Sequence, residues 1–191
     1  MMRFGKKGMF LMVLVLVIGV MTSACSKEAD VEGKKIIMGL DDTFAPMGFR
    51  DASGQIVGFD IDLAKEMAAR NGWELEFQPI DWSMKETELN AGNIDLIWNG
   101  YTITELRKEM VNFSTPYLAN AQVVVVLKDS PITNLNDLIG KSVATQAESS
   151  SLDAARAEVG FIESLKDGKL IEYATFTDVF NDLESKRSEA I

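Results

Sequence analysis

Apolar and polar residues alternate in blocks along the chain from Lys35 onward. The run KIIMGL at 35–40 is almost uniformly apolar after its first residue and predicts a buried strand. The segment 58–72 instead carries apolar residues at spacings of four, which predicts one face of a helix. These positions are Phe59, Leu63 and Met67, with Ala64 and Ala68 beside them on the same face. Asp60 is the expected N-cap of this helix, and Gly72 marks its expected end.

The pattern continues through further strands and helices. WELEF at 73–77 alternates between apolar and acidic residues, as a half-exposed strand does. Ser83 and Glu86 have the spacing of a capping box for the next helix. IDLIW at 94–98 predicts a strand, and Thr104 is the expected cap of the short helix that follows it.

QVVVVL at 122–127 is too apolar for a half-exposed strand, so both of its faces are expected to be covered. A second series of turns, strands and helices follows in the segments 135–140, 141–145, 150–160, 169–174 and 176–187. The last helix is strongly amphipathic, with apolar positions at Phe176, Val179, Phe180 and Leu183.

Alternating strands and helices predict α/β layers with largely parallel sheets. The two series predict two lobes: lobe 1 at 35–122, and a hinge strand with an incomplete lobe 2 at 123–191. The final residues SEAI have the pattern of an opening strand, so we expect the second lobe to be unfinished.

The amino terminus has the pattern of a secretory signal. Basic MRFGKK leads into apolar MFLMVLVLVIGVM, a core that is short for a membrane span, and then into TSAC. Small residues that end on Cys25 resemble the lipobox of bacterial lipoproteins, although Thr22 stands where leucine is most usual. That resemblance implies a signal peptide at 1–24 and a lipidated Cys25 with a flexible tether at 25–34. An uncleaved anchor helix with an incidental cysteine is the alternative.

Composition removes several classes of function. The 191 residues include 19 Lys and Arg against 29 Asp and Glu, a net charge of −10 that disfavours nucleic acid as a partner. The chain has no histidine and one cysteine, which excludes Ser-His-Asp and Cys-His catalysis and a disulfide within the chain. A zinc site of the usual ligands is disfavoured for the same reason, and we expect neither metal nor cofactor.

Candidate binding residues follow the predicted strands at their C-terminal ends, where α/β sheets commonly hold ligands. They are Asp41, Phe44, Trp82, Asn99, Gly100, Thr102, Arg107, Ser149 and Ser150. Arg107 is either a solvated surface charge or the fixed cation of a small anion pocket, and no other Lys or Arg is expected on this rim of lobe 1. This rim is suited to binding a zwitterion with a short aliphatic side chain, because it combines aromatic faces, hydroxyl groups, one cation and a helix N-terminus.

Three stretches of the chain resemble the family 3 solute-binding proteins of polar amino-acid ABC importers. They begin GLDDTFAPMGF, DWSMKETELNAGNID and QVVVVLKDS, and they include the motifs GFDIDLA, TITELRKE and FSTPY. The resemblance runs from about Lys35 to Ile191. It implies the type II periplasmic-binding-protein fold, in which two α/β lobes joined by hinge strands close on a ligand.

The resemblance also implies roles for the candidate residues. Arg107 would hold the ligand α-carboxylate in a bidentate pair, helped by Thr102 and by main-chain N–H groups near Thr102 and Ser149. Phe44 and Trp82 would sandwich the ligand side chain. The other positions would contact the amino group or the side chain of the ligand: Asn99 and Gly100 through oxygen atoms, Asp41 from lobe 1, and Thr145 and Ser150 from lobe 2.

The implied function is an extracytoplasmic, lipid-anchored receptor that captures a polar or cationic amino acid and delivers it to an ABC permease. It is expected to act as a monomer and to make or break no bond. Two alternatives stay open: an extracellular sensory domain, and an enzyme similar to cyclohexadienyl dehydratases with Asp41, Asp81 or Glu148 as its acid. Relatives carry an amine-binding carboxylate just after the strand that SEAI begins, so we expect the chain to be a fragment. The particular amino acid and the type of cell envelope stay undetermined.

Overall fold

The computed structural model describes residues 33–191, and two α/β lobes account for them. The residues from Lys34 to Ile191 form one compact unit, so contacts between the two lobes belong to that unit. The predicted signal peptide at 1–24 and the predicted lipidation site Cys25 lie outside the described residues. Within 33–191, no helix combines the length and the apolar character needed to cross a bilayer.

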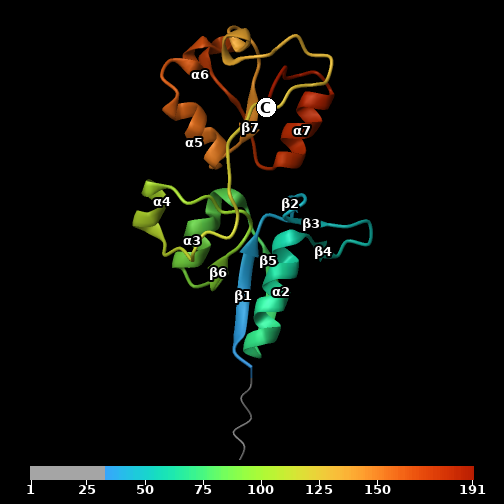
Figure 1. Cartoon of the computed structure of the whole chain (residues 1–191), viewed down its shortest axis with the longest axis vertical. Helices are drawn as coiled ribbons and strands as arrows, with labels where there is room; N and C mark the ends of the chain where they lie inside the picture. The colour runs from blue at the N-terminus through green and yellow to red at the C-terminus, as the bar shows by residue number, and fades with distance from the viewer. Residues whose placement is uncertain (1–32) are drawn as a thin grey trace, which may run out of the picture. The chain divides into compact units, whose positions relative to one another are not determined.

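Lobe 1 is built on a parallel sheet with the strand order β5-β1-β6. β1 (Lys35–Leu40) pairs over its whole length with β5 (Glu74–Pro79), and two of its residues pair with β6 (Leu96–Ile97). Helix α2 (Phe59–Asn71) runs alongside β1 (Figure 1). Strand and helix share a core of Met38, Leu40, Ile61 and Ala64. The predicted strand at 35–40 and the helix after it are confirmed.

The first turn of α2 differs from its prediction. Gly58 is the N-cap, so the prediction that Asp60 caps the helix is wrong. The Asp60 side chain is instead fully buried and accepts a hydrogen bond from the Tyr117 hydroxyl at 2.8 Å. Burial raises the pKa of the Asp60 carboxyl. Phe59 is exposed, and the buried face is carried by smaller residues that let the helix approach the sheet: Ile61, Ala64 and Ala68. Gly72 ends the helix in the left-handed conformation, as predicted.

Three short antiparallel strands follow β1 that the sequence pattern did not predict. β2 (Thr43–Phe44), β3 (Gly48–Arg50) and β4 (Ile56–Val57) pair in that order. Strands of two or three residues are too short to show a periodicity. Gly48 permits the close approach of β3 to the candidate site, because a Cβ there would lie 2.7 Å from Asn99 Nδ2.

The 3-10 turn η1 (Trp82–Met84) and helix α3 (Lys85–Asn90) follow β5. The capping box predicted for Ser83 and Glu86 is wrong. Asp81 caps η1 instead, because its carboxylate accepts hydrogen bonds from the Ser83 amide and hydroxyl at 2.9 and 2.7 Å. The turn places Trp82 immediately beyond the end of the sheet.

Lobe 2 contains a parallel pair of strands, β7 (Ala144–Gln146) and β8 (Ile171–Tyr173). Its other elements are the 3-10 turns η2 (Leu135–Leu138) and η3 (Lys166–Gly168) and the helices α5 (Ser150–Ala157), α6 (Phe161–Ser164) and α7 (Phe176–Glu184). The buried core of this lobe consists of Leu138, Val143, Leu165 and Ala190. In α7 the predicted apolar face is divided: Val179 and Leu183 are buried, whereas Phe180 is exposed.

The prediction that 122–127 is a strand with both faces covered is wrong. The chain between α4 (Glu105–Met110) and η2 is drawn without helix or strand (Figure 1), and Val123 is 71% exposed. Val125 exchanges two backbone hydrogen bonds with Ile191, at 2.8 and 3.0 Å. Apolar composition alone does not bury a segment: residues 122–125 are exposed, and Val126 is only partly buried against the lobe 2 core.

Candidate functional site

A cavity of about 40 Å³ lies where the C-terminal ends of the lobe 1 strands meet lobe 2. It is lined by Asp41, Phe44, Trp82, Asn99, Gly100, Thr102, Arg107, Gln146, Ser149, Ser150 and Phe176. The structure therefore brings together all the residues singled out in the sequence except Thr145, and it adds Gln146 and Phe176. Side chains more than 100 positions apart in the chain share this one space.

Arg107 is buried in the cavity wall, with only 5% of its side chain exposed. Nη1 donates to the Thr102 carbonyl at 3.1 Å, and Nη2 donates to the Glu148 carbonyl at 3.3 Å. The nearest carboxylate paired with it is Asp153, 3.7 Å from Nη2. Arg107 is therefore not the solvated surface charge that was the alternative.

Helix α4 and Tyr101 fix the direction of this guanidinium. Thr104 Oγ1 accepts from the Arg107 amide at 3.2 Å, which confirms the predicted cap. The guanidinium lies 4.7 Å from the centroid of the Tyr101 ring. The Tyr101 hydroxyl donates to Glu86 at 2.6 Å, and burial together with this bond raises the pKa of the phenol. The cation is thus held in place by protein groups before any ligand arrives.

Aromatic rings from both lobes line the cavity. Phe44 in β2 and Phe176 in α7 lie with ring centroids 5.3 Å apart at an angle of 30°. Trp82 is buried and meets the Tyr101 ring edge-on at 5.8 Å. Gly100 has a φ of 61°, and a Cβ there would lie 3.3 Å from the Phe44 ring, so glycine suits this position.

Asp41 and Gln146 connect the lobes through a buried hydrogen bond. Gln146 Nε2 donates to Asp41 Oδ2 at 2.8 Å and to the Ala174 carbonyl at 2.9 Å. The other carboxylate oxygen of Asp41 accepts from the amide and hydroxyl of Thr43, at 2.9 and 2.6 Å. Asp41 is therefore a buried acceptor on which three donors already converge.

Asn99 supports the backbone of the site. Its Oδ1 accepts from the Asp41 amide at 3.2 Å, and its Nδ2 has no partner among the described residues. An amide oxygen has two lone pairs, so Oδ1 can accept one more hydrogen bond, and Nδ2 is an additional donor for a ligand.

Hydroxyl groups of Thr102 and Ser150 meet across the lobes at 3.0 Å. Asn120 Nδ2 donates to Thr102 Oγ1 at 2.7 Å, and Gln122 Nε2 donates to Ser150 Oγ at 3.2 Å. The segment that follows α4 therefore contributes two amides to this contact.

Ser149 is the N-cap of α5, because its Oγ accepts from the Leu152 amide at 3.2 Å. The same hydroxyl donates to the Gln146 carbonyl at 2.6 Å. Thr145 does not line the cavity, and its hydroxyl forms a 2.9 Å hydrogen bond with that of Ser151. Side chains alternate along a strand, so adjacent residues of β7 face opposite sides and only Gln146 reaches the cavity.

A second buried cation, Lys85, lies behind the cavity wall without lining the cavity. Only 3% of its side chain is exposed. Nζ donates to the carbonyls of Trp82 and Glu148, both at 3.1 Å, and lies 3.3 Å from Glu86. Burial lowers the pKa of Lys85, and the Glu86 carboxylate opposes that effect.

The arrangement is suited to binding a small zwitterion. Within residues 33–191, no group of three or more His, Cys, Asp or Glu side chains could hold a metal ion. A guanidinium, hydroxyls and a capped helix start can receive a carboxylate, while rings and the Asp41 carboxylate can receive the remainder of the molecule.

Comparison with known proteins gives consistent matches over most of the chain. Residues 36–188 match the family described as bacterial extracellular solute-binding proteins, family 3. The chain is 32% identical over 190 residues to the arginine-binding extracellular protein ArtP of Bacillus subtilis. The aligned region covers 97% of this chain and 71% of that protein. It is 33% identical over 181 residues to the lysine/arginine/ornithine-binding periplasmic protein of Escherichia coli, covering 94% of this chain and 67% of that protein.

Solved structures give the same result. An ABC uptake transporter substrate-binding protein from Streptococcus pneumoniae with bound histidine is 41% identical and superimposes with a TM-score of 0.79. That match covers 82% of this chain and 64% of that structure. The chain thus spans about two thirds of the length of such relatives.

Proposed function

This chain belongs to the bacterial extracellular solute-binding proteins of family 3 and has the type II periplasmic-binding-protein fold, and from that premise we propose that it is the amino-acid receptor of an ABC importer. It captures a polar or cationic amino acid between its lobes outside the cytoplasm and presents it to the permease. No covalent bond is made or broken in this process.

The buried Arg107 is the observation that carries the proposal. A buried guanidinium in a cavity wall must be stabilised by an anion or by hydrogen-bond acceptors. Two main-chain carbonyls use only part of its five donors. A ligand carboxylate paired with the remaining donors would supply about 1.5–3 kcal/mol for each charge-assisted bond. That is a large part of the roughly 8 kcal/mol of micromolar binding.

The division of the site between lobes supports closure as the mechanism. Lobe 1, proposed at 35–122, contributes Arg107 and the Phe44 ring, and lobe 2 with the hinge, proposed at 123–191, contributes Gln146. A ligand that touches both lobes gains contacts only when they are together. It therefore shifts the equilibrium toward the closed form by the free energy of those extra contacts.

Relatives support the class of ligand. The matched proteins are named for arginine, for lysine, arginine and ornithine, and for histidine. Asp41 offers a buried carboxylate in the cavity, opposite in charge to such side chains. A polar or cationic side chain stacked against Phe44 and Trp82 is consistent with both observations.

The remaining parts of the proposal concern anchoring and partners. The lipobox pattern that ends on Cys25 supports cleavage after residue 24 and lipidation of the cysteine thiol, with 25–34 as a tether. The receptor would act as a monomer whose closed pair of lobes is recognised by the permease.

Titration calorimetry with the twenty amino acids, cystine and ornithine tests the function. We expect one or a few polar or cationic ligands to bind at micromolar concentration or tighter, and Arg107→Ala to lose that binding. Prephenate and arogenate incubated with the protein should yield no product.

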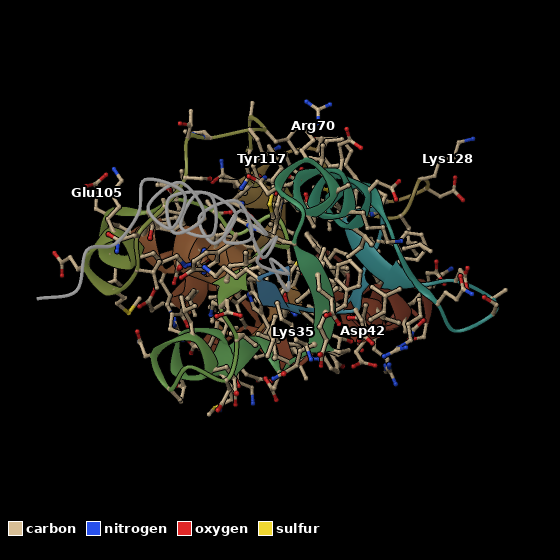
Figure 2. All side chains as sticks on the ribbon, turned by 90° about the horizontal axis from the view of Figure 1, so that it is seen from below. Lys35, Asp42, Arg70, Glu105, Tyr117 and Lys128 are labelled. Atoms are coloured by element: carbon tan, nitrogen blue, oxygen red, sulfur yellow. The ribbon has the colours of Figure 1, made fainter. Side chains whose placement is uncertain are left out.

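Arg70→Ala is the matched control. Arg70 lies on the outer face of α2 with 76% of its side chain exposed, paired with Glu66 at 2.7 Å, and points outward (Figure 2). This variant should bind like the unaltered protein. Robust amino-acid binding by Arg107→Ala would remove the proposal.

A further inference from the structure

Lys85 is the first residue of α3 in lobe 1, but its ammonium contacts lobe 2. The side chain is held within its own lobe by the Trp82 carbonyl at 3.1 Å and by Glu86 at 3.3 Å. The third contact is the Glu148 carbonyl at 3.1 Å, 63 positions further along the chain. Lys85 does not line the cavity, so none of these contacts depends on a ligand.

The acceptor of this contact has an unusual backbone. Glu148 has a φ of 52°, in the left-handed region that residues other than glycine seldom adopt. Its carbonyl accepts from both Lys85 Nζ and Arg107 Nη2. The next residue, Ser149, caps α5. A single main-chain oxygen of lobe 2 therefore anchors the start of α5 to two buried cations of lobe 1.

Arg107 is the other cation that bridges the lobes, through the Glu148 carbonyl and the Asp153 carboxylate. The remaining hydrogen bonds between side chains of the two lobes near the cavity come from neutral groups: Gln146 to Asp41, Thr102 with Ser150, Gln122 to Ser150, and Thr177 to the Thr43 carbonyl. Hydrogen bonds from a charged group are stronger than neutral ones. Arg107 is proposed to bind the ligand with its remaining donors, whereas Lys85 lies behind Trp82 and lines no part of the cavity.

Because the Lys85 ammonium is buried, its hydrogen bond to the Glu148 carbonyl forms only when the two lobes are together. An ammonium with 3% exposure needs acceptors around it, because burial without them is strongly unfavourable. When the lobes separate, water replaces the Glu148 carbonyl and the ammonium is hydrated again. The lowered pKa of Lys85, caused by burial, agrees with an ammonium that has lost most of its water.

We propose that Lys85 is a positioning residue for closure: its ammonium holds the Glu148 carbonyl, and with it the start of α5, against the cavity wall whether or not a ligand is present. The consequence for binding rests on the proposed function, whereas the consequence for closure does not. A residue that acts through closure alone weakens every ligand by the same factor, since it contacts none of them.

The experiment compares Lys85→Met, which removes the charge at similar length, with Lys85→Arg, which restores a charged donor. Dyes on Arg70→Cys in lobe 1 and Lys169→Cys in lobe 2 report the distance between lobes, with Cys25→Ser in the background so that no other thiol reacts. Lys128→Met is the matched control, because Lys128 is exposed and points outward (Figure 2).

In the ligand-free protein, Lys85→Met should shift single-molecule energy transfer toward the open form, and Lys85→Arg should restore it. Calorimetry should show binding about tenfold to a hundredfold weaker for Lys85→Met, by the same factor for each amino acid that binds. Circular dichroism and tryptophan fluorescence verify that each variant folds; if Lys85→Met does not, Lys85→Gln replaces it.

Unchanged energy transfer in the ligand-free variant would overturn the inference. Unequal losses among ligands would also overturn it, because they would make Lys85 a ligand contact. If the unaltered protein binds no amino acid, the proposed function fails, but the distance measurement still decides the role of Lys85.

Discussion

Replacing Arg107 with lysine separates the charge of the guanidinium from its geometry. Lysine keeps the positive charge but carries a compact ammonium in place of a planar fork. Arg107 lies 4.7 Å from the Tyr101 ring centroid and donates to the Thr102 and Glu148 carbonyls. A lysine cannot maintain these three contacts and also form two parallel hydrogen bonds to a carboxylate.

The expected loss follows from the bonds that lysine cannot make. Losing one charge-assisted hydrogen bond to the ligand should weaken binding by about 1.5–3 kcal/mol. That range corresponds to an affinity about 10-fold to 150-fold lower. Arg107→Ala removes the charge as well and should weaken binding further, so the two variants form an ordered series.

Calorimetry with the tightest-binding amino acid measures this series. Arg156→Lys is the control, because Arg156 makes a 3.8 Å contact with Glu172 and its side chain is 52% exposed. An Arg107→Lys variant that binds within about threefold of the unaltered protein would refute the bidentate geometry, because a point charge would then be sufficient.

Three further predictions concern stability and anchoring. Glu148→Gly keeps the carbonyl but relieves the left-handed backbone, and should raise the free energy of unfolding by about 0.5–1 kcal/mol in urea titrations; a decrease would contradict the strain. Burial lowers the pKa of Lys85, so the unfolded chain binds more protons than the folded one between the lowered pKa and about 10.4, and stability should rise with pH in that window. Urea titrations at pH 7 and pH 9.5 should show a smaller rise for Lys85→Met, and equal slopes would contradict the burial. Cys25→Ser should abolish incorporation of a labelled fatty acid and move the protein from the membrane fraction to the soluble fraction; retention on the membrane would favour an uncleaved anchor.

Long periodic segments allowed the fold to be predicted. β1 and α2 were predictable because apolar residues fill one strand and recur through thirteen helical residues. The β2-β3-β4 meander was not predictable, because each of its strands has only two or three residues, too few to show an alternating pattern. The valine run at 122–127 was misjudged because apolar composition indicates a strand without indicating what would cover it.

The candidate site was largely predictable because the ends of parallel strands meet at one edge of a sheet. Phe176 was missed because its apolar character assigned it to the buried face of α7. Gln146 follows Thr145 directly, and the sequence carried no signal to favour one of them over the other as a cavity residue. Lys85 begins a polar helix, KETELN, and in such a sequence a lysine is indistinguishable from a solvated one.

The cavity wall is shared unequally between the lobes, and this inequality bears on how the protein can diversify. Lobe 1 carries the arginine and the Tyr101 ring beside it, whereas Gln146 and Phe176 come from separate elements of lobe 2. Substitutions at those two positions could therefore retune which metabolite is preferred without disturbing the grip on its acid group. Part of the wall of this site can therefore vary in one lobe while the arginine stays unaltered in the other.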